Sequence, residues 1–251
     1  KWEARSNNWK NVFDPSHNLM RGRNLDGTFE DNFSPYRWGG AFTEGNAWHY
    51  TWSVFHDVAG LKEKMGGAET FTAMLDSVFV VPPIYDDSYY GFRIHEITEM
   101  QVANMGNYAH GNQPAQHMIY LYDWAGAPAK GQKWIREVMD RLYSARPDGY
   151  CGDEDNGQTS AWYVFSALGF YPVCPASDEY ALGTPYFQKA VVHLADGREL
   201  VINADGNSQA TPYVAGMKFN GKAHESSFLN HSELVKGAEI DFTMSSEPVE
   251  K

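Results

Sequence analysis

The chain changes its hydrophobic period near residue 175. Before that point apolar residues recur every three or four positions, the period of an amphipathic helix, whereas short alternating runs broken by Gly, Asn and Asp follow it. The sequence therefore predicts a mainly α fold, in which residues 1–175 are helical and residues 176–251 form a small antiparallel β-rich region. Within that region, runs 190–194 and 199–202 flank a turn that contains Asp196-Gly197, as in a β-hairpin. Further strands are expected at 214–219, before Asn220-Gly221, and at 239–244.

Five segments of the first part carry the helical period. They are residues 45–60, 68–80, 115–125, 128–146 and 159–170. Segments rich in Gly, Ala and aromatic residues alternate with amphipathic segments, as the inner and outer helices of an α/α toroid would. A plain helical array would show the same alternation, so both interpretations stay open. Residues 81–110 are polar and tyrosine-rich, which predicts a long irregular loop with a function.

Charge and composition narrow the classes of partner. The net charge of −12 repels phosphate backbones, and no apolar run is as long as a membrane span, so we expect no nucleic-acid partner and no membrane insertion. Aromatic residues make up 15% of the chain. Flat rings with polar edges suit the faces of sugars, although a helical core packed with aromatic side chains would have the same composition.

The N-terminus and the cysteines also carry expectations. Residues 1–6 read as the middle of an interrupted helix, which predicts that the chain was cut from a longer protein. Cys151 and Cys174 are compatible with one disulfide in an oxidising compartment or with two free thiols.

Three polar segments stand at the starts of three predicted helices. They are Glu44-Gly45-Asn46, Gly111-Asn112-Gln113-Pro114 and Gly152-Asp153-Glu154-Asp155-Asn156-Gly157. Alternate helices of a toroid run in the same direction, so these three starts would meet at one end of the bundle. A carboxylate at a helix start can simply cap the helix. Capping needs only one acid, however, and crowded acids repel one another unless one is protonated or a cation lies nearby, so we expect a function for Asp153 and Asp155.

Glu44 and the Asp153–Asp155 pair fit the two carboxyl roles of glycoside hydrolysis. Aromatic neighbours would partly desolvate the Glu44 carboxyl and so favour the protonated form that a general acid needs; they are Trp38, Phe42, Trp48 and Trp52. The two aspartates would stay ionised and activate water. The alternative for Glu44 is a buried acid paired with a cation such as Arg37.

A polar face follows the second of these segments. It is formed by Gln113, Gln116, His117 and Tyr120, at spacings of three and four. Such groups could bind sugar hydroxyls or offer oxygen ligands to a hard cation. His117 has a simpler interpretation as a hydrogen-bonded core histidine, and His49 is ambiguous in the same way.

At these segments the chain resembles glycoside hydrolase family 92, the bacterial exo-acting α-mannosidases. The matching stretches begin with Trp38-Gly39-Gly40-Ala41-Phe42-Thr43-Glu44-Gly45-Asn46-Ala47-Trp48-His49-Tyr50-Thr51-Trp52, continue with Tyr108-Ala109-His110-Gly111-Asn112-Gln113-Pro114 and Gly152-Asp153-Glu154-Asp155-Asn156-Gly157-Gln158, and end with residues 160–172. The likeness runs through essentially the whole chain.

The resemblance implies an (α/α)6 toroid of which this chain holds the later helices, preceded in the parent protein by an N-terminal β-sandwich and the earlier helices. It also implies a secreted, periplasmic or cell-surface bacterial enzyme that releases terminal α-linked mannose from mannosides or N-glycans with inversion, with Ca²⁺ as cofactor. Glu44 would be the general acid, and Asp155 with Asp153 the base. Asn112 and Gln113 would contact calcium, and we expect the mannose-containing glycan to contact Trp38, Trp48, His49, Gln113 and His117.

One departure from the family bears on the substrate. Many members have Asn-Glu-Pro where this chain has Asn112-Gln113-Pro114, and replacing a carboxylate by an amide weakens a cation contact. Cleavage of α-1,2 linkages is the family's commonest activity and our first expectation, and this departure predicts a shifted linkage preference. Two other classes remain: a non-catalytic calcium-dependent glycan-binding module, and a structural helical array whose acids only cap helices.

Overall fold

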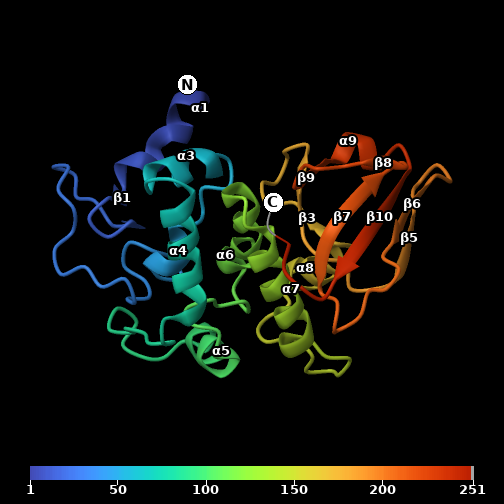
Figure 1. Cartoon of the computed structure of the whole chain (residues 1–251). Helices are drawn as coiled ribbons and strands as arrows, with labels where there is room; N and C mark the ends of the chain where they lie inside the picture. The colour runs from blue at the N-terminus through green and yellow to red at the C-terminus, as the bar shows by residue number, and fades with distance from the viewer. Residues whose placement is uncertain (250–251) are drawn as a thin grey trace. The chain divides into compact units, whose positions relative to one another are not determined.

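The computed structural model describes residues 1–249 (Figure 1). The chain divides into two compact units. The first unit comprises residues 1–118 together with 150–153, and the second comprises residues 119–149 together with the chain from 154 onward. This division follows contacts and not helix or strand content, so the predicted organisation into a toroid segment (1–175) and a β-rich region (176–251) stays a prediction.

Short helices and two small strands make up the first unit. Its elements are α1 (Trp2–Arg5), the 3-10 helix η1 (Ser6–Asn11), β1 (Phe13–Asp14), β2 (Leu19–Met20), α2 (Ala47–Tyr50), α3 (Val58–Lys64), α4 (Ala68–Val80), α5 (His95–Ala103) and α6 (Gln113–Gln116). Helix α4 has the predicted bounds. Gly67 precedes it with φ of 105°, and Val81 turns to extended backbone before Pro82.

Two predictions in this unit are wrong. Residues 45–60 do not form one helix, because α2 ends after one turn and α3 begins only at Val58, where the Asp57 carboxylate accepts the Gly60 N–H (3.1 Å). Residues 81–110 are not wholly irregular, because they contain α5. This helix buries Ile97 and Met100, which form a core cluster with Trp38 and Ala109. The charged residues between its apolar positions obscured its period.

The second unit holds α7, the longest helix of residues 1–249, and most of the strands. Its elements are the 3-10 helix η2 (Met118–Ala125), α7 (Pro128–Leu142), α8 (Gln158–Leu168), β3 (Phe170–Tyr171), β4 (Glu179–Leu182), β5 (Lys189–His193), β6 (Glu199–Asn203), β7 (Tyr213–Phe219), β8 (Lys222–Ala223), β9 (Phe228–Asn230), α9 (His231–Leu234) and β10 (Ala238–Ser245). The segment 115–125 was predicted as one helix, but α6 makes one turn and η2 continues as a 3-10 helix.

The sheets confirm the predicted strands and correct their arrangement. A five-stranded sheet has the order β5-β6-β10-β7-β8, and a three-stranded antiparallel sheet has the order β3-β4-β9. The predicted hairpin is the antiparallel pair β5–β6, and the turn at Asn220-Gly221 joins β7 to β8. However, β6 and β10 run parallel, so the β region is mixed and not purely antiparallel.

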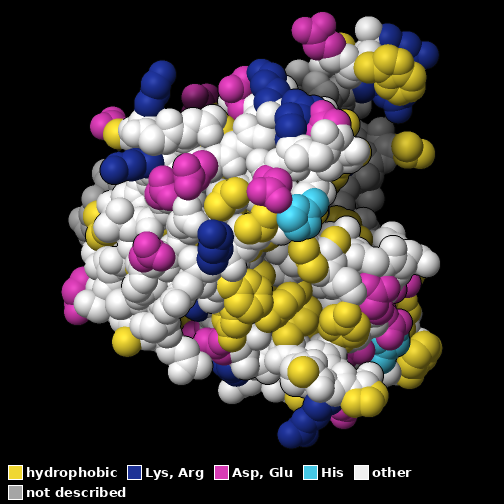
Figure 2. Space-filling model, turned by 90° about the vertical axis from the view of Figure 1, so that its right-hand side faces the viewer, with side chains coloured by type: hydrophobic (Ala, Val, Ile, Leu, Met, Phe, Trp, Pro, Cys, Tyr) yellow, Lys and Arg dark blue, Asp and Glu magenta, His cyan; other side chains and the backbone are white. Residues whose placement is uncertain are grey.

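The core of the second unit lies between the sheets and α8. Its buried members include Phe170, Leu200, Ile202, Ile240 and Phe242, and Phe165 and Leu168 of α8 pack against them. Strand β5 lies at the edge of the five-stranded sheet and is at most half-buried along its length. Figure 2 looks onto the side of the molecule where β5 and β6 lie, and it shows hydrophobic side chains gathered among polar and acidic ones.

A buried arginine ties α7 to two loops of the second unit. The Arg136 guanidinium donates to the Pro185 carbonyl and to the Asn207 side-chain oxygen, and its carbon skeleton is buried. Gln132, one turn earlier, accepts the Val214 N–H of β7 (3.0 Å). These polar contacts explain why α7, predicted only as an amphipathic partner helix, also buries charged and polar residues. Within residues 1–249, no helix combines the length and the apolar character that crossing a bilayer requires.

Candidate functional site

Glu44 occupies a closed loop of the first unit with an unusual backbone conformation. The Gly39 N–H donates to the Gly45 carbonyl (3.0 Å) and closes the loop. Glu44 has φ of 48°, in the left-handed region. Most other non-glycine residues with positive φ in the described chain are asparagines, which tolerate this region, whereas a glutamate there is strained.

Two distant side chains hold the Glu44 backbone in place. Its N–H donates to the Tyr90 hydroxyl (3.1 Å), 46 residues away, and its carbonyl accepts from the Asn112 side-chain amide (2.5 Å), 68 residues away. Both backbone polar groups of the residue are therefore bonded, while its side chain is exposed. The result is a carboxyl group presented to solvent from a fixed backbone.

The predicted desolvation of Glu44 is wrong for this structure. Its side chain is exposed, whereas Trp38, Trp48 and Trp52 are buried. The charge of Glu44 acts on Tyr50. Burial raises the pKa of the Tyr50 hydroxyl, and the negative charge of Glu44 raises it further. That hydroxyl donates to the Thr43 carbonyl, next to Glu44.

Trp38 and Trp48 do not offer ring faces to a sugar in the described structure. Trp38 has no exposed surface and packs in the core cluster with Ile97 and Met100. Trp48 is also buried, beside Tyr36. We predicted both as sugar contacts because aromatic residues near a candidate acid suit such a role, but their apolar surface serves packing.

His49 is a structural residue, contrary to the predicted sugar contact. Its ring Nδ1 accepts the Asn46 N–H (3.2 Å), while the Asn46 side chain accepts the His49 N–H (3.3 Å), which makes a capping box at the start of α2. Its Nε2 donates to the Asn107 carbonyl (2.8 Å), so neither ring nitrogen is left for a ligand. Burial lowers the pKa of His49 to about 4, which keeps the ring neutral.

The segment around Asn112 is only partly as predicted. Asn112 is buried and stands before α6, in which Pro114 occupies the first turn as expected. Gln113 is half-buried. His117 is buried, its Nε2 donates to the Trp52 carbonyl (2.8 Å), and burial lowers the pKa of His117 to about 4. The core-histidine interpretation of His117 therefore fits, and the predicted sugar contact does not.

Asn112 and Gln113, the residues predicted to contact calcium, lie at the start of α6. Among residues 1–249, no group of three or more His, Cys, Asp or Glu side chains is arranged to hold a metal ion. Asn112 and Gln113 offer two neutral amide oxygens, and Asn112 already uses its amide N–H on Glu44. Calcium takes about six to eight oxygen ligands, usually with carboxylates among them. These two residues could supply only a fraction of such a shell.

The acidic residues before α8 differ in their contacts. Glu154 has a structural role, because its carboxylate accepts the Gly157 N–H (2.7 Å) and the Ser160 hydroxyl (2.7 Å). The Ser160 hydrogen bond is the main reason why the pKa of Glu154 lies below its usual value. Asp153 and Asp155 flank Glu154 and are both exposed. Asp153 lies in the first compact unit and Asp155 in the second.

Asp155 has the same backbone peculiarity as Glu44. Asp155, Asn156 and Gly157 are three successive residues with positive φ, of 50°, 57° and 102°. Within residues 1–249 the Asp155 side chain makes no hydrogen bond and no ion pair, so no other side chain competes for its carboxylate. No side chain of the described residues caps α8, so the capping alternative considered from the sequence does not apply to Asp155.

Glu99 and Tyr90 are site neighbours that the sequence did not point out. Ideal Cβ atoms on Gly111 and Gly152 would lie 2.8 and 2.7 Å from the Glu99 carboxylate, and one on Gly152 would lie 2.6 Å from the Gly111 Cα. The Asn112 segment and the Asp153 segment therefore meet at Gly111 and Gly152, and the Gly111 backbone leaves no room for a side chain at Gly152. His95 bonds Glu99 (2.8 Å), at the i,i+4 helical spacing that could have revealed the pair.

Both cysteines are free in the structure, so the free-thiol alternative is the one found. Burial, with the Glu99 charge nearby, raises the pKa of Cys151 to about 12 and makes its thiol unreactive.

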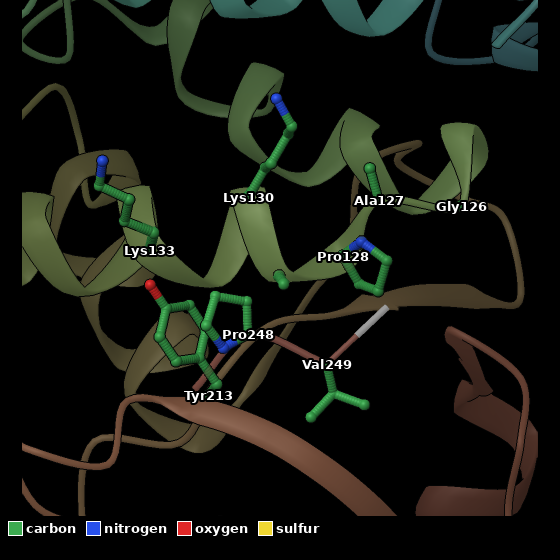
Figure 3. Close-up of a pocket in the computed structure, with 9 residues that line it drawn as sticks. Gly126, Ala127, Pro128, Lys130, Lys133, Tyr213, Pro248 and Val249 are labelled. Carbon is green, nitrogen blue, oxygen red and sulfur yellow. The ribbon is translucent and has the colours of Figure 1, made fainter. Parts of the chain in front are cut away.

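A pocket of the second unit is separate from all of these residues. It has a volume of about 410 Å³ and lies where the start of α7 meets Tyr213 of β7 and the stretch Pro248–Val249 (Figure 3). Lys130 and Lys133 project from α7 at its rim. None of the predicted site residues lines it.

The comparisons with known proteins agree with the motifs. The model of the family described as glycosyl hydrolase family 92 catalytic domain matches residues 1–246. The solved structure of the family GH92 inverting mannosidase BT2199 from Bacteroides thetaiotaomicron is 51% identical, with a TM-score of 0.86 over 98% of this chain and 34% of that one. The matched third of that structure therefore has the fold of this chain.

Two further proteins are similar to this chain. The family GH92 α-mannosidase BT3965 of the same bacterium, solved in complex with mannoimidazole, is 35% identical, with a TM-score of 0.86 over 96% of this chain and 32% of that one. An uncharacterized secreted glycosidase from Arthroderma benhamiae is 22% identical over 98% of this chain and 32% of its own length. The chain thus spans about a third of the length of the relatives it matches.

Because the first unit contains buried neutral histidines, we expect it to lose stability at low pH. Burial lowers the pKa values of His49 and His117 to about 4 and that of His110 to about 3. These folded-state pKa values lie below the ordinary value of 6.5, so protonation favours the unfolded chain. The folded state therefore has its full stability above pH 6.5 and loses it as the pH falls towards 4. Each histidine should lower the free energy of unfolding by up to about 1.4 kcal/mol per pH unit in that window.

Urea unfolding of the protein between pH 7.5 and 4.5 measures this loss. The variant His117→Gln removes one titrating group and should show a shallower dependence on pH. An equal slope in the variant would contradict a neutral buried His117.

Proposed function

Because the chain belongs to glycosyl hydrolase family 92, we propose that its parent protein is an exo-acting α-mannosidase that releases terminal α-linked mannose with inversion of the anomeric carbon. The family match over residues 1–246 and the likeness to a structure described as an inverting mannosidase support the class of reaction. The observation that carries the site is Glu44, an exposed carboxyl whose strained backbone is bonded on both sides by Tyr90 and Asn112.

Glu44 would act as the general acid. Its carboxyl gives a proton to the glycosidic oxygen as the bond from that oxygen to the mannose C1 breaks, so the leaving group departs as a neutral alcohol. A backbone fixed at both the N–H and the carbonyl limits where this carboxyl can point. Orientation of this kind lowers the barrier because less freedom is lost when the substrate reacts.

Asp155 would act as the general base, with Asp153 beside it in sequence. An ionised Asp155 takes a proton from the water that attacks C1 on the face opposite to the leaving group, and this attack inverts the anomeric carbon. The carboxylate has no competing partner among residues 1–249. Glu154 between the two aspartates is occupied by Gly157 and Ser160, which supports a division between one structural acid and the catalytic ones.

Substrate, cofactor, partners and location complete the proposal. The substrate is a mannose-containing glycan, with α-1,2-linked mannose as the first linkage to test and Gln113 as the residue that shifts the preference. Calcium is proposed as cofactor, and it would contact the mannose hydroxyls when bound. Asn112 and Gln113 would contribute amide oxygens, and the rest of the parent protein, its N-terminal β-sandwich and earlier helices, would supply the other ligands. A secreted, periplasmic or cell-surface location is consistent with the fungal relative that is named as secreted.

Proton NMR of the intact parent protein with mannobioses of defined linkage tests this proposal. We expect β-mannose to appear first from an α-linked substrate, and the rate to vanish in excess chelator and return with added Ca²⁺. First-formed α-mannose would contradict inversion, and full activity in chelator would contradict the metal. Tight binding of mannobiose without any product would instead favour the non-catalytic glycan-binding module.

The acid role of Glu44 predicts a dependence on the leaving group. In the full-length protein, Glu44→Gln should slow mannobiose hydrolysis by about 10²–10⁴-fold, because a sugar alkoxide is a poor leaving group without a proton. An aryl mannoside with an acidic phenol needs no such proton and should react at nearly the parental rate. Steady-state kinetics on both substrates measure the difference. Equal losses on the two would remove Glu44 from the acid role.

The base role of Asp155 can be separated from capping by a matched pair of variants. Asp155→Asn should lower kcat by about 10²–10⁴-fold on both kinds of substrate and leave the melting temperature close to the parental one. Glu154→Gln, one residue away, should lower the melting temperature because it weakens the bonds to Gly157 and Ser160, while kcat is retained. The reverse pattern, with Asp155 affecting only stability, would show that Asp155 is structural.

A further inference from the structure

Two exposed aromatic side chains lie on the segment that contacts Glu44. Tyr89 is 62% exposed and Phe92 is 64% exposed, although both rings are large and apolar. Between them, Tyr90 is half-buried and packs against the core cluster of Trp38, Ile97, Met100 and Ala109. The Tyr90 ring lies 5.2 Å from that of Tyr89 and 6.4 Å from that of Phe92, centroid to centroid. The segment is therefore anchored in its middle and exposes a ring on each side.

This aromatic segment, residues 89–92, and the Glu44 loop are built as one piece. The Tyr90 hydroxyl accepts the Glu44 N–H (3.1 Å). The ring of Tyr89 fills the place where a side chain at Gly39 would stand, and Gly39 closes the Glu44 loop through its bond to Gly45. Nearby, the Trp38 N–H donates to the Asp86 carbonyl (2.9 Å) and the Asp86 N–H to the Tyr36 carbonyl (2.8 Å). The position of Tyr89 is thus fixed relative to Glu44, and Phe92 follows Tyr90 by two residues.

The position of a general acid determines where the leaving group lies. The acid protonates the oxygen that joins the released sugar to the rest of the substrate, so its carboxyl must be within hydrogen-bond reach of that oxygen. The sugar that carries this oxygen away therefore lies beside the acid. A sugar ring has an apolar face that packs well on an aromatic ring with a fixed orientation, and polar hydroxyls at its edge.

We propose that Tyr89 and Phe92 form the binding surface for the leaving-group sugar, the neutral pyranose on the far side of the scissile bond from the released mannose. The inference rests on the proposed acid role of Glu44. Residues 89–92 would then recognise the leaving-group sugar, and other residues would bind the released mannose. Both rings lie on a single short segment, so one loop would set this part of the specificity.

The test compares two substrates that share the mannose and differ in the leaving group. One is a mannobiose that the full-length parent protein cleaves, and the other is α-mannosyl fluoride, whose leaving fluoride is too small to reach either ring. Tyr89→Ala and Phe92→Ala should each lower kcat/KM for the mannobiose by about tenfold, the loss expected for one ring contact. The same variants should hydrolyse the fluoride at the parental rate.

Three controls make the result specific. Tyr89→Phe keeps the ring and should keep the mannobiose activity. Trp2→Ala removes another large exposed ring of the same unit, 73% exposed, and should change neither substrate. Melting temperatures of all variants show whether the fold is kept. An equal loss on both substrates, or a lower melting temperature without discrimination between them, overturns the inference and shows that the rings serve the fold, the mannose or another part of the parent protein.

The outcome also separates this inference from the proposed function. If the parent protein hydrolyses both substrates and the alanine variants cleave the mannobiose at the parental rate, only the inference about the leaving-group surface is overturned. A parent protein that hydrolyses neither substrate overturns the mannosidase and this inference with it.

Discussion

A short loop can keep a carboxyl group in one position only if the loop backbone is itself fixed. Two hydrogen bonds to the Glu44 backbone fix it here. The Tyr90 hydroxyl accepts its N–H and the Asn112 amide donates to its carbonyl. Each partner comes from a segment far away in sequence, and each is itself fixed, Tyr90 against the Trp38 cluster and Asn112 by burial before α6. The left-handed backbone of Glu44 is unfavourable alone, and it persists because surrounding contacts determine it.

The same device recurs at Asp155, which also has a left-handed backbone and an exposed carboxylate. Here a neighbouring acid does the structural work, since Glu154 bonds Gly157 and Ser160 at the start of α8. In both segments the group proposed to react makes few contacts through its side chain, and the neighbouring residues supply the order. Exposed carboxylates on ordered backbones are what proton transfer to and from a bound substrate requires.

The sequence was most informative where structure is decided locally. Helix α4 has its predicted bounds because Gly66-Gly67 before its start and Pro82-Pro83 after its end limit it by backbone chemistry alone, and the β5–β6 hairpin follows from its turn residues. The family was confirmed because its motifs are long. The roles of Trp38, His49 and His117 were missed because burial and hydrogen-bond partners depend on contacts with distant segments, such as Asn107 for His49. Helix α5 was missed because charged residues interrupt its buried stripe, and the parallel pairing of β6 with β10 leaves no local signal.

The meeting of Gly111 and Gly152 limits how such a site can diversify. At Gly152 an added methyl group would collide with the Gly111 backbone, and at either position it would press against the Glu99 carboxylate. The two segments can therefore pass each other this closely only while position 152 has no side chain.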